Sequence, residues 1–159
     1  FIFTINLKKI MQIFIGGIGC FWDETEYQGI PGIISTECGY CGGKNPKVSY
    51  EQVCGGDTEH IEVVKVTFNP KIISYEEVTR LFFKIHDPTT LNRQGPNVGH
   101  QYRSEIFYNT EEERIAAEKV LNEVNKKLGG KVVTVIRKEK NYCKAEEYHQ
   151  KYFEKRNKK

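Results

Sequence analysis

The chain has 159 residues, with 24 Lys and Arg against 21 Asp and Glu, which gives a formal net charge of +3. This length suits one ordinary domain with a single core, and a hydrophobic content of 38% is too high for a disordered chain. The near balance of charges gives no electrostatic reason for a nucleic-acid or membrane partner, and no apolar run approaches the ~20 residues of a membrane span. We expect one compact, monomeric domain.

The first methionine, Met11, directly precedes a strand-like run. We expect the natural chain to start there, with residues 1–10 as a non-native or untranslated leader and residues 11–155 as the domain. Lys8 and Lys9 follow the apolar part of that leader, which is the reverse of a secretory signal. The odd count of five cysteines argues against a fully paired disulfide framework and for reduced thiols. Together these features predict a cytoplasmic protein.

Strand-like and helix-like patterns alternate along the chain. Ser74 and Glu77 form a capping-box pattern at the start of the clearest helix. Residues 89–102 have no periodicity and form a long loop of the kind that carries function. The expected strands are 12–15, 33–40, 60–68, 104–108 and 132–136, and the expected helices are 20–29, 74–86 and 110–128. This order predicts a single α+β domain, a ferredoxin-like two-layer sandwich with a mixed sheet flanked by helices and a long irregular C-terminal segment.

Cys20 is the best candidate nucleophile. It follows a glycine turn and opens a helical segment, where unpaired N–H groups and the helix dipole stabilise a thiolate. A buried structural cysteine is the alternative interpretation. The adjacent Phe21 and Trp22 fit either core packing or an apolar pocket for a small substrate group.

Glu62 is the second informative residue. Strand alternation places it on the same face as Val64, Val66 and Phe68. A carboxyl group on an apolar face is desolvated, which raises its pKa into the range of a general acid. If this end of the strand lies at the sheet edge instead, Glu62 is solvated.

Cys38 and Cys41 form a C-x-x-C pattern, which is also found in thiol–disulfide oxidoreductases and in zinc-binding interaction modules. In a strand, however, residues three apart point to opposite faces, and Gly42 and Gly43 follow where a redox motif needs a helix. No second C-x-x-C supports a metal site, and the four histidines show no ligand spacing. We expect no metal, and we interpret the histidines as hydrogen-bonded structural residues.

The sequence Gly19-Cys20-Phe21-Trp22 resembles the signature of the type A peptide methionine sulfoxide reductases. Further segments in family order carry the same resemblance: Gly39-Tyr40-Cys41-Gly42-Gly43, Ser49-Tyr50-Glu51-Gln52-Val53-Cys54, Gly56-Asp57-Thr58, His86-Asp87-Pro88-Thr89, Gln101-Tyr102-Arg103-Ser104 and Ala145-Glu146-Glu147-Tyr148-His149-Gln150. The resemblance extends from about Gln12 to Phe153, which is essentially the whole domain.

The resemblance implies that Cys20 attacks the sulfur of (S)-methionine sulfoxide, free or within oxidised proteins, and is left as a sulfenic acid. Glu62 matches the glutamate that protonates the sulfoxide oxygen, and Tyr40 and Tyr102 match tyrosines that hydrogen-bond it. The remaining implied contacts are an aromatic cage around the S-methyl group, Phe21 and Trp22, and a substrate-binding amide, Asn97, where relatives often carry aspartate.

Recycling of the sulfenic acid has two candidate routes. The chain stops at Lys158-Lys159 without the cysteine-bearing tail that many relatives use. Cys143 is the best internal resolving cysteine, and an external thiol such as thioredoxin, glutaredoxin or glutathione is the route we favour slightly. We expect no bound cofactor.

Overall fold

The computed structural model describes residues 11–17, 21–147 and 150. A six-stranded sheet with the order β7-β6-β1-β3-β2-β8 lies at its centre. β6 and β7 are parallel and the other neighbours are antiparallel, so the sheet is mixed. Its strands are β1 Gln12–Gly17, β2 Ile33–Cys41, β3 Ile61–Phe68, β6 Glu105–Tyr108, β7 Val135–Lys138 and β8 Cys143–Lys144. A separate hairpin pairs β4 Arg93–Gln94 with β5 Asn97–Val98.

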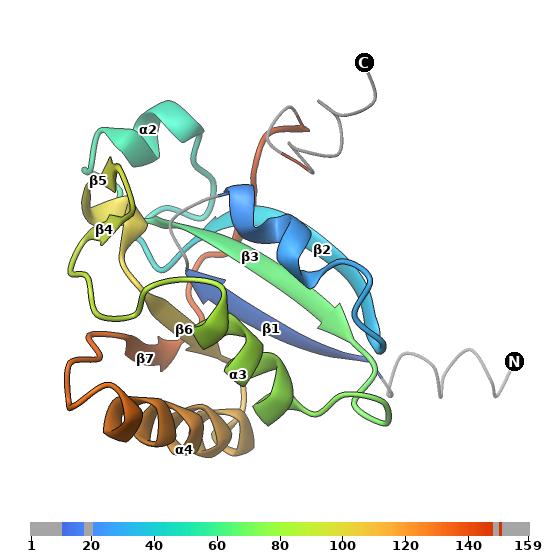
Figure 1. The fold of residues 1–159 in the computed structure, drawn as a ribbon. Helices are drawn as coiled ribbons and strands as arrows, with labels where there is room; N and C mark the ends of the chain where they lie inside the picture. The colour runs from blue at the N-terminus through green and yellow to red at the C-terminus, as the bar shows by residue number, and fades with distance from the viewer. Residues whose placement is uncertain (1–10, 18–20, 148–149, 151–159) are drawn as a thin grey trace, which may run out of the picture.

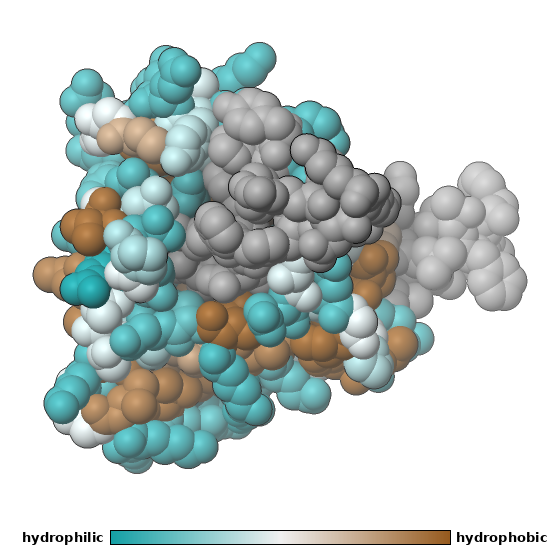
Figure 2. Space-filling view, turned by 45° about the horizontal axis from the view of Figure 1, so that its top comes forward, coloured by the Kyte–Doolittle hydropathy of each residue, from teal (hydrophilic) through white to brown (hydrophobic). Residues whose placement is uncertain are grey.

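Helices cover one face of the sheet, as Figure 1 shows for α3 and for the 3-10 helix η1. The helices are η1 Phe21–Tyr27, α2 Tyr50–Cys54, α3 Tyr75–Lys84, η2 His100–Tyr102 and α4 Glu111–Lys127. Among the helices of the described residues, none is both long and apolar enough to cross a membrane. Figure 2 shows hydrophilic side chains interspersed with smaller apolar areas on the described surface of one side.

The main core lies between these helices and the sheet. Val64, Val66 and Phe68 alternate along β3 and pack against buried residues of α3 and α4, among them Phe82 and Val120. Burying a large apolar side chain contributes about 1.5–3 kcal/mol, which makes this face the main source of stability. The predicted α+β domain with a mixed sheet flanked by helices is confirmed.

The opposite face of the sheet is covered by the chain after β7. Ile61, Val63 and Phe107 form a second apolar cluster, against which Tyr142 packs. A side chain at Gly39 would collide with the Tyr142 ring, because a Cβ atom there would lie 2.5 Å from it. The long C-terminal segment predicted as irregular therefore acts as the cover of this face.

Helix ends follow the capping residues in the sequence. The Ser74 side chain accepts a hydrogen bond from the Glu77 N–H at the start of α3, as predicted. The Thr110 side chain does the same for α4. A complete capping box of Ser49 and Gln52 starts α2, a helix that the sequence patterns did not predict because five residues are too few to show periodicity.

Three other regions differ from the predicted elements. The segment expected to be an α-helix over residues 20–29 contains the 3-10 helix η1 instead, and residues 18–20 lie outside the described residues. The long loop over residues 89–102 contains the β4–β5 hairpin and η2. The strand β8 was not predicted, because two residues carry too little pattern.

Candidate active site

Glu62 lies near the start of β3, directly opposite Tyr40 on β2. Its side chain shares the sheet face of Val64, Val66 and Phe68, and the residue is only 3% exposed. Burial raises the pKa of the Glu62 carboxyl to about 8. The predicted desolvation is confirmed, and Glu62 is in large part a neutral acid near pH 7.

Tyr50 and Tyr102 lie near the Glu62 carboxyl, although they belong to different parts of the chain. Burial, then the charge of Glu62, raises the pKa of Tyr102 in η2, while a hydrogen bond from Tyr50 acts in the opposite direction. The pKa of Tyr50 is raised first by a hydrogen bond with Cys54, then by burial and by the nearby Tyr102 and Glu62. A carboxylic acid and two phenols are thus grouped at one end of β3.

Tyr50 is the residue that sequence reasoning missed. It is the first residue of α2, and the capping box of Ser49 and Gln52 was the only local signal that a helix begins there. That signal fixes the backbone of Tyr50, but only the fold brings its side chain to Glu62 and Tyr102.

Tyr40 has a different environment. It is fully buried, and its hydroxyl donates a hydrogen bond to the Glu146 carboxylate at 2.7 Å. The Tyr40 side chain lies on the same sheet face as Glu62, because the two residues are direct partners across β2 and β3.

The loop that carries Tyr102 is linked to α3 through His86. The His86 ring donates from Nδ1 to the Phe82 carbonyl at 2.6 Å and accepts at Nε2 from the Ser104 hydroxyl at 2.8 Å. Burial lowers the pKa of His86 to about 4, so this ring is a neutral structural link, as predicted. Asn97 lies on β5, half-buried, in the hairpin next to η2.

Cys20 and the side chains of Phe21 and Trp22 lie outside the described part of the structure. The elements on either side of Cys20 are described. β1 ends at Gly17 and pairs with β3, and η1 begins at residue 21 and packs against β2 and β3. Both elements that flank Cys20 therefore contact β3, the strand that carries Glu62.

Glu24 connects η1 to β2 through hydrogen bonds. Its carboxylate is fully buried and accepts hydrogen bonds from the Thr36 hydroxyl at 2.8 Å and from the Cys38 thiol at 3.4 Å. These bonds fix the segment that follows Cys20 onto the face of β2 that carries Tyr40.

The geometry of Cys38 and Cys41 argues against a dithiol. Cys38 packs in the cluster of Tyr40 and Val53, whereas Cys41 packs with Ile61 and Val63 on the opposite face. Burial raises the pKa of the Cys41 thiol to about 12, which makes it a poor nucleophile. Within the described residues, no three His, Cys, Asp or Glu side chains converge as a metal site would require.

Two other cysteines lie near the acid and the tyrosines. Cys143 on β8 is the direct partner of Tyr40 on β2, so Glu62, Tyr40 and Cys143 form one row across three neighbouring strands. Cys54 closes α2, is exposed, and interacts with Tyr50. Both thiols are free.

Comparison with known proteins gives one consistent result. The family model for peptide methionine sulfoxide reductase matches residues 11–159. The peptide methionine sulfoxide reductase MsrA of Pelagibacter ubique is 56% identical over 147 residues, which is 92% of this chain and 100% of that protein. The Methanococcus maripaludis C7 MsrA is 53% identical over 142 residues, covering 89% of this chain and 90% of its own.

Solved structures agree with this result. Reduced Mxr1 of Saccharomyces cerevisiae superposes with a TM-score of 0.87 at 39% identity, covering 95% of this chain and 88% of that chain. Mxr1 in complex with Trx2 superposes with a TM-score of 0.62 at 28% identity, covering 84% and 80%. The fold, the buried acid with its tyrosines and these matches lead to one conclusion: the chain belongs to the peptide methionine sulfoxide reductase family.

Proposed function

We propose that the protein reduces the S epimer of methionine sulfoxide, free and in oxidised proteins, with Cys20 as the nucleophile and Glu62 as the proton donor. The observation that carries this assignment is the burial of Glu62, which holds its pKa at about 8. Oxygen leaves sulfur readily only once it is protonated, so the acid must begin neutral. A buried carboxyl that has no cation beside it among the described residues meets that requirement.

The reaction balances with the groups of the site. The Cys20 thiolate attacks the sulfoxide sulfur while the oxygen takes a proton from Glu62. The substrate S–O bond then breaks, the hydroxyl passes to the Cys20 sulfur as the S–S bond between Cys20 and substrate breaks, and the electron pair stays on the methionine sulfur. The products are methionine and a Cys20 sulfenic acid, and the proton lost from the Cys20 thiol balances the one that restores Glu62. Phe21 and Trp22 are proposed to surround the S-methyl group, and Asn97 to bind the substrate through its amide.

The two tyrosines next to Glu62 are proposed to hold the sulfoxide oxygen. Tyr102 and Tyr50 both interact with this carboxyl. Phenol hydroxyls that donate toward the oxygen stabilise its growing negative charge in the transition state. For Tyr40, direct contact with the sulfoxide stays a prediction, and its hydroxyl has the Glu146 carboxylate as partner here.

We propose that Cys143 resolves the sulfenic acid, in place of the external thiol that the sequence alone slightly favoured. Its thiol attacks the Cys20 sulfur, a disulfide forms, and water leaves with the oxygen; an external dithiol of the thioredoxin class then reduces the disulfide. The row of Glu62, Tyr40 and Cys143 supports this step, because neighbouring strands are about 4.8 Å apart and Cys143 is thus about 10 Å from Glu62. Cys143 also lines an open pocket of about 410 Å³, which gives a reductant access. A cytoplasmic monomer stays our prediction.

The reaction is tested with racemic methionine sulfoxide and dithiothreitol, with the epimers separated by chiral chromatography. We expect loss of the S epimer alone, and no loss with Cys20→Ser. The buried Cys41→Ser is the matched control and is expected to retain turnover. Consumption of both epimers, or activity without Cys20, would refute the assignment.

The resolving step is tested with thioredoxin as the only reductant. Cys143→Ser is expected to slow turnover with thioredoxin while leaving the first turnover unchanged, because the sulfenic acid still forms. Cys54→Ser is the matched control, since it removes the other thiol near the site. Unchanged turnover of Cys143→Ser with thioredoxin would assign recycling to direct attack by the external thiol.

A further inference from the structure

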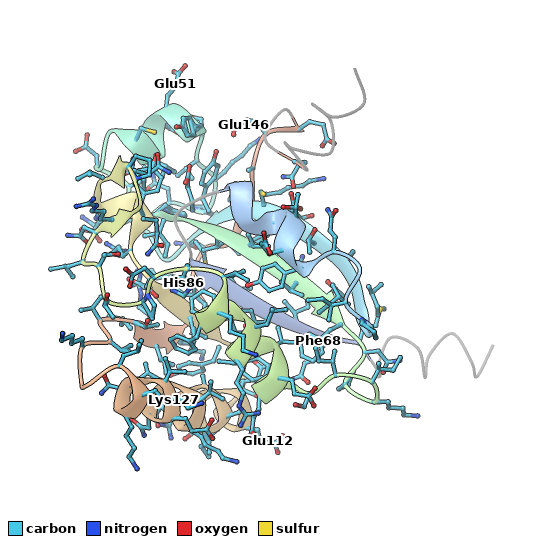
Figure 3. All side chains as sticks on the ribbon, in the orientation of Figure 1. Glu51, Phe68, His86, Glu112, Lys127 and Glu146 are labelled. Atoms are coloured by element: carbon cyan, nitrogen blue, oxygen red, sulfur yellow. The ribbon has the colours of Figure 1, made fainter. Side chains whose placement is uncertain are left out.

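Glu146 joins two elements of the active site that are distant in sequence. One of its carboxylate oxygens accepts a hydrogen bond from the Tyr40 hydroxyl at 2.7 Å, and the other accepts one from the Tyr50 N–H at 2.8 Å. Tyr50 begins α2, whereas Tyr40 lies near the end of β2. Figure 3 shows Glu146 in the C-terminal segment beside α2.

The position of Glu146 is itself fixed by the sheet. Lys144 on β8 pairs with Gly39 on β2, and the Ala145 N–H donates to the Cys38 carbonyl at 2.9 Å. The Gln150 side chain accepts a hydrogen bond from the Cys38 N–H and donates one to the Cys38 carbonyl. Glu146 therefore extends from a well-anchored part of the chain toward α2.

α2 depends on such an attachment more than α3 and α4 do. It has five residues, stands at the end of the sheet in Figure 1 and has only Val53 as a fully buried side chain. A helix this short is not stable by itself. Its capping box is local and sets where the helix begins, but it does not set where the helix lies relative to β2.

We infer that Glu146 is a positioning residue for the reaction: its carboxylate holds α2 against β2 and so places the Tyr50 hydroxyl beside Tyr102 and Glu62. This inference rests on the proposed role of Tyr50. Glu146 accepts from the backbone of the same residue whose side chain faces the acid, so the two effects are linked through one residue.

Removing both acceptor oxygens tests this role. In Glu146→Leu the Tyr40 hydroxyl and the Tyr50 N–H both lose the carboxylate that accepts from them. A glutamine can keep both contacts, because its oxygen accepts from the N–H while its NH₂ group donates to the phenol oxygen. Glu146→Leu should therefore release α2 from β2, and Glu146→Gln should largely retain the attachment.

The test is a double-mutant cycle on the single-turnover rate with (S)-methionine sulfoxide and no reductant. We expect Glu146→Leu to slow this rate at least tenfold, the cost of one hydrogen bond to a charged group, and to do so in the single-turnover rate constant at saturating substrate. Tyr50→Phe should slow it by at least as much. If Glu146 acts through Tyr50, the double variant is as slow as Tyr50→Phe alone.

Other outcomes have distinct meanings. Losses that multiply in the double variant would overturn the inference, because Glu146 would then act independently of Tyr50. A wild-type rate for Tyr50→Phe would instead overturn the proposed role of Tyr50. Glu147→Gln, at the exposed neighbouring position, is the matched control and should be as fast as wild type. If Glu146→Leu does not fold, Glu146→Asp, which keeps the charge but shortens the reach, enters the same cycle.

Discussion

Glu62 on β3 and Glu105 on β6 are buried alike, at 3% and 4% exposure, yet their surroundings differ. The Glu105 carboxylate accepts a hydrogen bond from Arg103 Nε at 2.7 Å and another from Arg137 Nε at 2.6 Å. For Glu62, burial is the cause that raises its pKa among the residues that the structure describes. One acid has its charge compensated by two guanidinium groups, and the other is held in its neutral form.

This difference assigns a structural role to Glu105 and supports the proposed role of Glu62 as a proton donor. The Glu105 pairs join the start of β6 to Arg137 on β7 and fix Arg103 beside Tyr102. Because folding raises the pKa of Glu62 from 4.5 to about 8, its contribution to stability falls as the pH rises through that window, by up to about 5 kcal/mol. The protein carries this cost at the position where the proposed reaction uses a neutral acid.

The largest expected effect is on catalysis at Glu62. Glu62→Gln keeps the shape of the side chain but removes the acidic proton, so we expect the single-turnover rate to fall by about 10²–10⁴. Glu105→Gln should retain its rate per folded molecule. A Glu62→Gln rate within about tenfold of wild type would remove Glu62 from the role of acid.

The next effect is on stability at Glu105. Glu105→Gln leaves two guanidinium groups without their carboxylate, and we expect urea unfolding at pH 7 to show a loss of about 2–3 kcal/mol, reduced from the fully buried case because both arginines are partly exposed. Glu62→Gln should be at least as stable as wild type under the same conditions. Equal losses in both variants would mean that the two acids have the same structural role.

A smaller effect is the pH dependence of the reductive step. If Glu62 donates the proton as proposed, the single-turnover rate should decline as the pH rises through about 8, by about tenfold for each further pH unit. The slow residual rate of Glu62→Gln should lack this decline. A decline that persists in Glu62→Gln would identify a different titrating group.

The sequence predicted correctly those features that depend only on the pattern within one strand or one helix. Alternation along β3 placed Glu62 on the apolar face, and the same period-two rule placed Cys38 and Cys41 on opposite faces of β2. The cap at Ser74 likewise marked the start of α3. These features follow from residues within one element, which is why the sequence was sufficient.

Features that depend on distant contacts were not predicted. α2 is only five residues long and receives the Glu146 carboxylate from 96 positions further along the chain. The strand β8 has two residues and exists through its pairing with β2. Tyr50 was therefore not recognised as part of the site, since its side chain reaches Glu62 only after α2, β2 and β8 have come together.

The smallest expected effect is at Cys41, a third buried titratable group that can be compared with Glu62 and Glu105. Like Glu62, it is held in its neutral form by burial, with a pKa of about 12, but it faces away from the site toward Ile61 and Val63. Alkylation by iodoacetamide at pH 8, read by peptide mass mapping, should modify Cys54 and spare Cys41 until the protein is unfolded. Cys41→Ala should change turnover by less than about twofold, because Cys41 packs on the face of β2 opposite Tyr40 and Glu62. Rapid labelling of native Cys41 together with a large loss of turnover would show that the two faces of β2 are coupled, and a redox role for Cys38 and Cys41 would again need to be considered.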